Sequence, residues 1–200
     1  MKLLPLLLAA LLATATAQLP ADLPKQLSNI SMDCREIGVG QRIKTDNSGL
    51  LGLLGDHEAR EHHGTISIEI SNLGRTPVEI TPVVYFLVRD ASGGEAIQLA
   101  ASRSTHLVVK PTAPEKWNVD MPSSIEHVDN SFLLGTGTRT GTKPAGWIAG
   151  CLTEKAFYPI KASSPTIMDY AQGPDFKAAR ELFEKKMPKD LTQRQATEVR

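Results

Sequence analysis

Apolar and polar side chains alternate along much of the chain, and this alternation predicts an antiparallel β protein. The clearest case is Gly64 to Leu73, where isoleucines occupy every second position between polar residues. The segment Pro77 to Asp90 becomes apolar on both parities in its second half, a pattern typical of a strand with neighbours on both sides and cover on both faces. We predict that it is the central strand, with a bulge or an edge position at Pro82, which cannot donate to a ladder.

Shorter alternating segments predict the other strands. The first strand begins at Ile30 and changes the phase of its apolar residues, which predicts a β-bulge near Arg35 or Glu36, or a change of sheet. Pro122 to Thr142 lacks such alternation and is expected to be a long connection. The remaining expected strands are centred on Ile97 to Leu99, Thr105 to Val109, Lys116 to Met121, Gly146 to Leu152 and Ala156 to Ala162.

Together these segments predict one all-β domain, an immunoglobulin-like antiparallel β-sandwich of about seven or eight strands, at residues 30–163. An exit segment with a short amphipathic helix is expected at residues 164–187, because Phe176 and Phe183 share an apolar stripe. A helix this short does not hold alone in water, so it must dock on the sandwich or on a partner.

The two ends of the chain have different characters. Residues 1–17 combine Lys2, an apolar run and small residues at Ala15 and Ala17, the pattern of a cleaved secretory signal peptide. The apolar run is shorter than the about 20 residues that a membrane span needs, so no transmembrane anchor is expected. We predict an exported protein that is periplasmic, outer-membrane-associated or extracellular. Residues 18–29 are interpreted as an extended leader and residues 188–200 as a flexible polar tail.

Charge and cysteine content narrow the picture further. Acidic and basic residues balance at 22 each, so no electrostatic field favours nucleic acid as a partner. Cys34 and Cys151 are expected in neighbouring strands, and an oxidising compartment permits a disulfide worth about 4 kcal/mol in the entropic account. Two buried free thiols are the equal alternative.

Two segments are candidate contact surfaces for a partner. The stretch Gly49 to Gly55 has no strand or helix period and carries leucines that are costly to expose to water. These leucines either fold back onto the sandwich or contact a partner. The apolar stripe of the predicted helix likewise either packs on the sandwich or contacts a partner. The candidate contact residues are Leu50, Leu51, Leu53, Leu54, Phe176 and Phe183.

Candidate chemistry is sparse. His57, His62 and His63 are weak metal candidates, because adjacent histidines on a strand point in different directions and no second ligand cluster lies downstream. We expect a solvated charged loop there, with no metal and no cofactor. The run GTGTRTGT before Lys143 lacks phosphate-loop spacing. GxSxG, SxxK, HExxH and CxxC motifs are absent, so no catalytic residue is predicted.

A family resemblance adds a biological setting. The stretch KPAGWIAGCLTEKAFYPIKASSPTIMDYA, Lys143 to Ala171, and VVYFLVRD, Val83 to Asp90, resemble small secreted immunoglobulin-like proteins of Verrucomicrobia-type bacteria. They are also similar to the pilus-associated immunoglobulin-like proteins of Akkermansia. The resemblance covers roughly Gly64 to Ala171 and implies an outer-membrane or pilus-complex setting. Its motifs mark core and turns, so no functional residue is carried over.

Three classes of function follow from these observations. The leading hypothesis is a non-catalytic binding or assembly module of the cell envelope, with a pilus or outer-membrane component as its protein partner. The second is a carbohydrate-binding module, which requires Trp117, Trp147 or Tyr170 to be exposed and coplanar. The third is a small hydrolase that uses a carboxylate or histidine pair.

Overall fold

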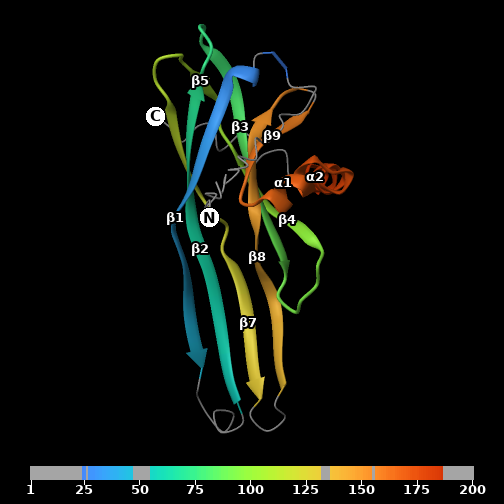
Figure 1. Ribbon diagram of the computed structural model, residues 1–200. Helices are drawn as coiled ribbons and strands as arrows, with labels where there is room; N and C mark the ends of the chain where they lie inside the picture. The colour runs from blue at the N-terminus through green and yellow to red at the C-terminus, as the bar shows by residue number, and fades with distance from the viewer. Residues whose placement is uncertain (1–23, 26, 47–54, 132–135, 155, 187–200) are drawn as a thin grey trace, which may run out of the picture.

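The computed structural model describes residues 24, 25, 27–46, 55–131, 136–154 and 156–186 (Figure 1). This part of the chain contains nine strands, a 3-10 turn and two helices, and every strand pairing is antiparallel. The predicted all-β, sandwich-like fold is therefore confirmed. The elements are η1 (Leu27–Asn29), β1 (Ile30–Asp46), β2 (Gly55–Asn72), β3 (Val78–Asp90), β4 (Ile97–Ser104), β5 (Leu107–Val109), β6 (Glu115–Asp120), β7 (Ser124–Ser131), β8 (Thr136–Leu152), β9 (Phe157–Ala162), α1 (Pro165–Gln172) and α2 (Pro174–Lys186).

Strand β3 lies at the centre, as predicted. It pairs with β8 on one side and with β5 and then β4 on the other. Pro82 lies where this second neighbour changes from β5, which ends opposite Ile80, to β4, which begins opposite Val83. The missing N–H of Pro82 therefore falls between the two ladders, which accounts for a proline in a central strand.

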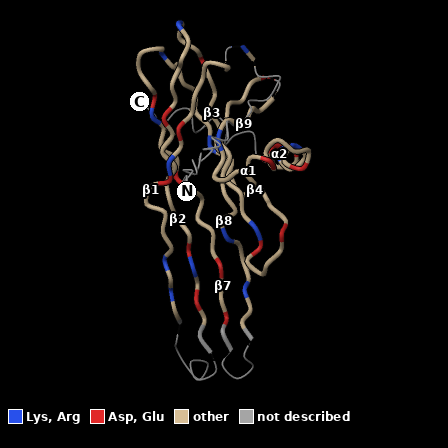
Figure 2. The backbone as a smooth tube through the Cα atoms, in the orientation of Figure 1, with Lys and Arg blue, Asp and Glu red and all other residues tan. Residues whose placement is uncertain are grey.

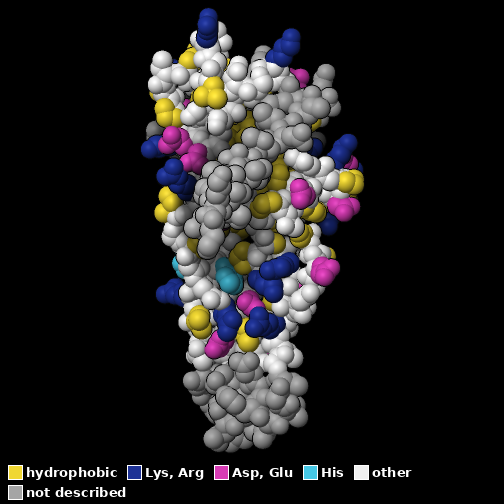
Figure 3. All heavy atoms as spheres, in the orientation of Figure 1, with side chains coloured by type: hydrophobic (Ala, Val, Ile, Leu, Met, Phe, Trp, Pro, Cys, Tyr) yellow, Lys and Arg dark blue, Asp and Glu magenta, His cyan; other side chains and the backbone are white. Residues whose placement is uncertain are grey.

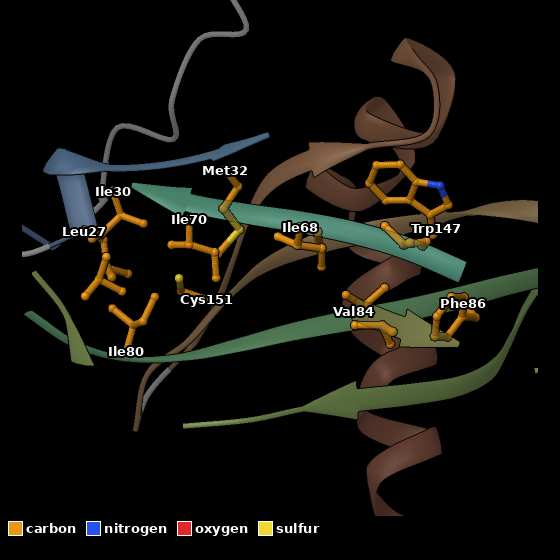
Figure 4. Packing of buried hydrophobic residues seen from close by; sticks show 14 residues of the cluster. Leu27, Ile30, Met32, Ile68, Ile70, Ile80, Val84, Phe86, Trp147 and Cys151 are labelled. Carbon is orange, nitrogen blue, oxygen red and sulfur yellow. The ribbon is translucent and has the colours of Figure 1, made fainter. Parts of the chain in front are cut away.

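Two apolar cores explain why β3 is apolar on both faces. Val84 and Phe86 point into a core shared with β1, β2, β6 and β8, of which Figure 4 shows a part. Tyr85 and Leu87 point the other way, into a second core closed by α1 and α2. The helices thus form a third layer beside the sheet that holds β3, β8 and β9 (Figure 1).

Helix α2 docks on the sandwich through Phe176, which is only 3% exposed. Its ring packs edge-on against Tyr85 and Tyr170, and the Tyr85 hydroxyl donates to the Glu184 carboxylate at 2.9 Å. Of the two predicted alternatives, Phe176 therefore takes docking on the sandwich, because its side chain completes the second core. Phe183 is half-buried. Helix α1 was not predicted as a separate element. It begins at Pro165, directly after the N-cap residue Ser164, whose side chain accepts a hydrogen bond from the Ile167 N–H.

The lower half of the molecule is one sheet in the order β1-β2-β7-β8 (Figure 1). Strand β2 pairs with β6 from Thr65 to Ile70 and with β7 from Gly55 to His62. The predicted charged loop around His57 to His63 is thus the first half of β2, and the predicted connection Pro122 to Thr142 holds β7 and the start of β8. Both predictions were wrong, because strands in a single layer need no apolar alternation.

The predicted bulge in β1 is present, a short distance beyond the expected position. The register with β2 shifts between Ile37 and Gly40, and Gly38 adopts a φ of 60°. Before the bulge Glu36 lies opposite Ile66, and after it Gln41 lies opposite His62. On β1, the even-numbered residues before the bulge lie on the inner face, which is the face toward the first core. After the bulge, the odd-numbered residues lie on this same face.

The cysteines do not lie in neighbouring strands. Cys34 is on β1, which pairs with β2, whereas Cys151 is on β8, which pairs with β3, β7 and β9. Both are free thiols. Burial raises the pKa of each thiol to about 12. The neighbouring-strand prediction is wrong. Cys151 is buried but Cys34 is only half-buried, so the alternative of two buried free thiols holds fully for Cys151 alone.

No helix among the described residues is long and apolar enough to span a membrane.

Candidate functional site: the waist cavity

Three irregularities of the sheets coincide at mid-height, a level that we call the waist. The β1 bulge lies between Ile37 and Gly40, and β2 exchanges its partner β6 for β7 just below Thr65. The register of β3 with β8 shifts between Leu87 and Val88. Bulges bend and twist strands, so the two register shifts, together with the change of partner on β2, keep the two sheets from closing on each other at this level.

A cavity of about 110 Å³ lies at the waist. We call it the waist cavity. Aromatic, aliphatic and proline side chains form most of its wall, and a few polar side chains interrupt it. The lining residues are Glu36, Val39 and Gly40 of β1, His62 and His63 of β2, Phe86, Leu87 and Val88 of β3, Met121 and Pro122 of the β6–β7 connection, Ser124 of β7, and Pro144, Gly146 and Trp147 of β8.

Trp147 is a fixed wall of the cavity. Its indole N–H donates to the Glu36 carboxylate at 2.7 Å. Its backbone N–H donates to Ser163 Oγ at 3.1 Å, and the Ser163 N–H donates to its carbonyl at 3.0 Å. The neighbouring Gly146 has a φ of 145°, and a Cβ there would lie 2.2 Å from Ser163 Oγ. Only glycine allows Ser163 to come this close. Ser163, directly before the helical layer, can therefore hydrogen-bond to the backbone of Trp147 and hold it in place.

Two buried polar groups of the cavity wall have no hydrogen-bond partner among the described residues. They are Ser124 Oγ and His62 Nε2. Ser124 is only 5% exposed. His62 Nε2 lies 3.7 Å from Glu126 Oε2, beyond hydrogen-bond distance. Ser124 and His62 are directly opposite each other in the ladder, yet they do not hydrogen-bond to one another. Buried groups left in this state cost about 1–3 kcal/mol each.

A charged strip continues from the cavity along the inner face of the lower sheet. Glu126 is buried, and its carboxylate lies 3.4 Å from Arg139 Nη1 on one side and near His62 on the other. Arg60 lies directly opposite Glu126 in the ladder and donates to Glu58 at 2.8 Å. Figure 3 shows basic, acidic and histidine side chains gathered below the middle of the molecule. The cavity therefore has apolar walls above and charged groups below.

The three predicted histidines do not form one site. His57 pairs with Asp129 and stacks on His127, with ring centroids 5.6 Å apart, whereas His62 lies on the opposite face. Among the described residues, no three potential metal ligands come together. His62 and His63 both line the waist cavity, because the β1 bulge opens the sheet beside them.

The other predicted site residues have diverse positions. Trp147 is buried, and Trp117 is half-buried and packed against the first core. Tyr170 is half-buried against Phe176. Leu50, Leu51, Leu53 and Leu54 lie outside the described residues, as do residues 1–17, for which the sequence predicts a signal peptide.

Sequence reasoning missed Ser124 and Glu126, the most buried polar residues of this region. Both lie in a segment expected to be a connection, and only strand pairing brings them beside His62. Their apolar neighbours Ile125 and Val128 have opposite parity and lie on opposite faces of β7, so no apolar alternation marked this strand in the sequence.

No protein-family model, no curated protein and no solved structure matches this chain. Function is therefore inferred from the sequence, the fold and the waist cavity.

Proposed function

We propose that this protein is a non-catalytic binding or assembly module of the cell envelope that receives a side chain of a protein partner in its waist cavity. The observation that carries the proposal is the buried Ser124 hydroxyl, which has no partner among the described residues and lines a largely apolar cavity. A bound group with an aliphatic body and one polar atom would satisfy this hydroxyl and fill the space.

The size of the cavity supports a side chain as its occupant. Pockets for whole small molecules measure about 300–1,000 Å³. The waist cavity measures about 110 Å³, closer to the about 150 Å³ of an engineered cavity that binds benzene. Such a volume suits one aliphatic or small aromatic side chain that a larger partner carries.

The geometry supports binding over the two alternative classes of function. The Ser124 hydroxyl and the His62 imidazole are two separate hydrogen-bonding groups, whereas a serine nucleophile is activated by a bonded base. Carbohydrate binding needs exposed, coplanar rings, but Trp147 is buried and the half-buried Tyr170 packs at 69° to Phe176 against the second core.

The envelope setting rests on the sequence. The signal-peptide pattern at residues 1–17 supports export, and the resemblance to pilus-associated immunoglobulin-like proteins supports a pilus or outer-membrane component as the partner. Mass measurement of the protein recovered from the envelope fraction should give a chain that begins at Gln18. An unprocessed chain in the cytosolic fraction would contradict this part of the proposal.

Site-specific photo-crosslinking in intact cells tests the proposed binding. A photoreactive residue at Val39, on the cavity rim, should capture an envelope protein, whereas one at Val108, an exposed valine on β5, should not. Ser124→Leu fills part of the cavity and should abolish the Val39 crosslink. The more conservative Ser124→Val controls for folding, which thermal unfolding of both variants verifies. Capture that Ser124→Leu leaves unchanged in a folded protein would overturn the proposal.

A further inference from the structure

Among the residues that the structure describes, the lower half of β1 is a free sheet edge next to the waist cavity. Within the described residues β1 pairs with β2 alone. Every second residue of an edge strand directs its backbone N–H and C=O outward, so the edge is a template for another strand. Unlike many natural edges, the segment Val39–Asp46 contains no proline. Its backbone is therefore open to pairing along its length.

The side chains of this edge form two rows with different chemistry. Val39 and Ile43 lie on the inner face and are 56% and 53% exposed. Arg42 and Lys44 lie on the outer face, opposite Glu61 and Ala59. Neither Arg42 nor Lys44 forms an ion pair within the described part of the chain. Figure 2 shows the basic residues of lower β1 on the outermost strand of the sheet, beside β2, which carries both acidic and basic residues.

We infer that the partner of this module supplies an extended segment that adds to β1 along Val39–Asp46, with aliphatic and acidic residues in alternation. The aliphatic side chains would pack beside Val39 and Ile43, and the acidic ones would face Arg42 and Lys44. Because adjacent strands lie about 4.8 Å apart, an aliphatic side chain beside Val39 reaches the waist cavity that this residue lines. The inference rests on the proposed function and names the chemistry of its partner.

Charge argues against a second copy of this chain as the added strand. Antiparallel pairing of two copies of the segment about Ile43 would place Arg42 of one copy opposite Lys44 of the other. Like charges directly opposite each other destabilise a strand pair. A foreign strand with carboxylates at these positions avoids the repulsion and neutralises both cations.

Synthetic peptides test the inference with the full mature chain. The probe is a peptide as long as Val39–Asp46 in which valine and glutamate alternate. One control alternates valine and lysine, and the other carries the probe sequence with every second backbone amide N-methylated. The readout is amide hydrogen exchange of β1, supported by binding isotherms. The probe should slow exchange at Val39–Asp46, and neither control should do so.

Variants of β1 locate the interaction on the two rows. The double variant Arg42→Glu with Lys44→Glu should bind the probe about tenfold more weakly and should bind the peptide of valine and lysine instead. Ile43→Ser should lower the affinity for the probe about threefold. Ile37→Ser is the matched control, because Ile37 is also 53% exposed and on β1 but lies on the outer face above the bulge. It should leave probe binding unchanged.

Each result decides between the inference and its rivals. Absence of protection by the probe, or equal protection by both charge patterns, overturns the inference. Concentration-dependent protection of β1 without peptide also overturns it, in favour of a second copy. If the probe fails while Ser124→Leu still abolishes the Val39 crosslink, only strand addition falls and the proposed function stands. If both experiments fail, both proposals fall.

Discussion

The Ser124 hydroxyl is a group that folding alone does not explain. It is buried at a position where an alanine would leave nothing unsatisfied. We predict that Ser124→Ala raises the free energy of unfolding by about 1 kcal/mol, because it removes a desolvated hydroxyl. The same change should weaken capture of the partner, the exchange of stability for function that binding sites commonly show. Urea unfolding measures the first effect, and a loss of stability would mean that the fold itself satisfies the hydroxyl.

The backbone conformation at Gly146 positions its neighbour Trp147 in the wall of the waist cavity. Its positive φ and the 2.2 Å approach of a Cβ to Ser163 Oγ make Gly146→Ala both strained and crowded. We predict a loss of about 2–3 kcal/mol in unfolding free energy, with a change in Trp147 fluorescence. Gly93→Ala is the matched control, because Gly93 has a φ of 107° but nothing within 4 Å of its Cβ. It should cost about 1 kcal/mol, and equal losses would disprove the crowding at Ser163.

The buried thiols predict how stability depends on alkaline pH. Burial raises the pKa of Cys34 and Cys151 from 9.0 to about 12, and burial and then Glu184 raise the pKa of Tyr85 above its ordinary 10.0. The unfolded chain therefore releases thiol protons from about pH 9, while the native protein keeps them up to about pH 12. Stability should be unaffected by these groups below pH 9 and fall as pH rises through this window.

Thermal unfolding between neutral and alkaline pH measures this effect. A variant with Cys34→Ala and Cys151→Ala should begin its decline about one pH unit later, where Tyr85 starts to ionise in the unfolded state. An identical pH profile in the variant would show that the thiols are accessible to water in the native protein.

At the scale of elements, the sequence predicted those strands that pack against an apolar core. The central strand β3, the isoleucine half of β2 and the β1 bulge all followed from apolar periodicity, because a buried core requires it. The first half of β2, β7 and the start of β8 have no such requirement. Their stability comes from pairing between distant segments, such as His62 with Ser124, which no local pattern encodes. The candidate site lies at this junction, and for that reason the sequence did not reveal it.

The sequence offered helix α2 as a candidate contact surface, and the structure shows that it covers the second core. We predict that Phe176→Ala lowers the free energy of unfolding by about 3–5 kcal/mol, because it opens a hole among Tyr85, Phe157 and Tyr170. Leu182→Ala on the same helix should change it by less than about 0.5 kcal/mol, since Leu182 is 59% exposed. An unchanged stability in the Phe176 variant, together with lost partner capture, would restore the contact hypothesis.

At the scale of the whole molecule, a layered body passes at the waist into a single sheet. The upper body has two apolar cores and a helical layer, whereas the lower sheet carries the charged strip on its inner face. Packing between layers ties strand opening to global unfolding, but a single layer lacks this constraint. We therefore expect a partner strand that adds to lower β1 to bind where the sheet opens most easily, and binding to make this part of the sheet harder to open.

Strand β2 allows this contrast to be measured within one element, because it runs through both halves of the molecule. Amides from Ile66 to Ile70 pair with β1 and β6 and belong to the first core. Amides from Glu58 to His62 pair with β1 and β7 and have hydrogen-bonded neighbours on both sides as well. Backbone pairing is thus matched, and only the cover on the inner face differs. We predict that native-state hydrogen exchange from Glu58 to His62 occurs through openings of lower free energy than from Ile66 to Ile70. Equal opening free energies would mean that β2 unfolds as one unit and that the lower sheet is as rigid as the body.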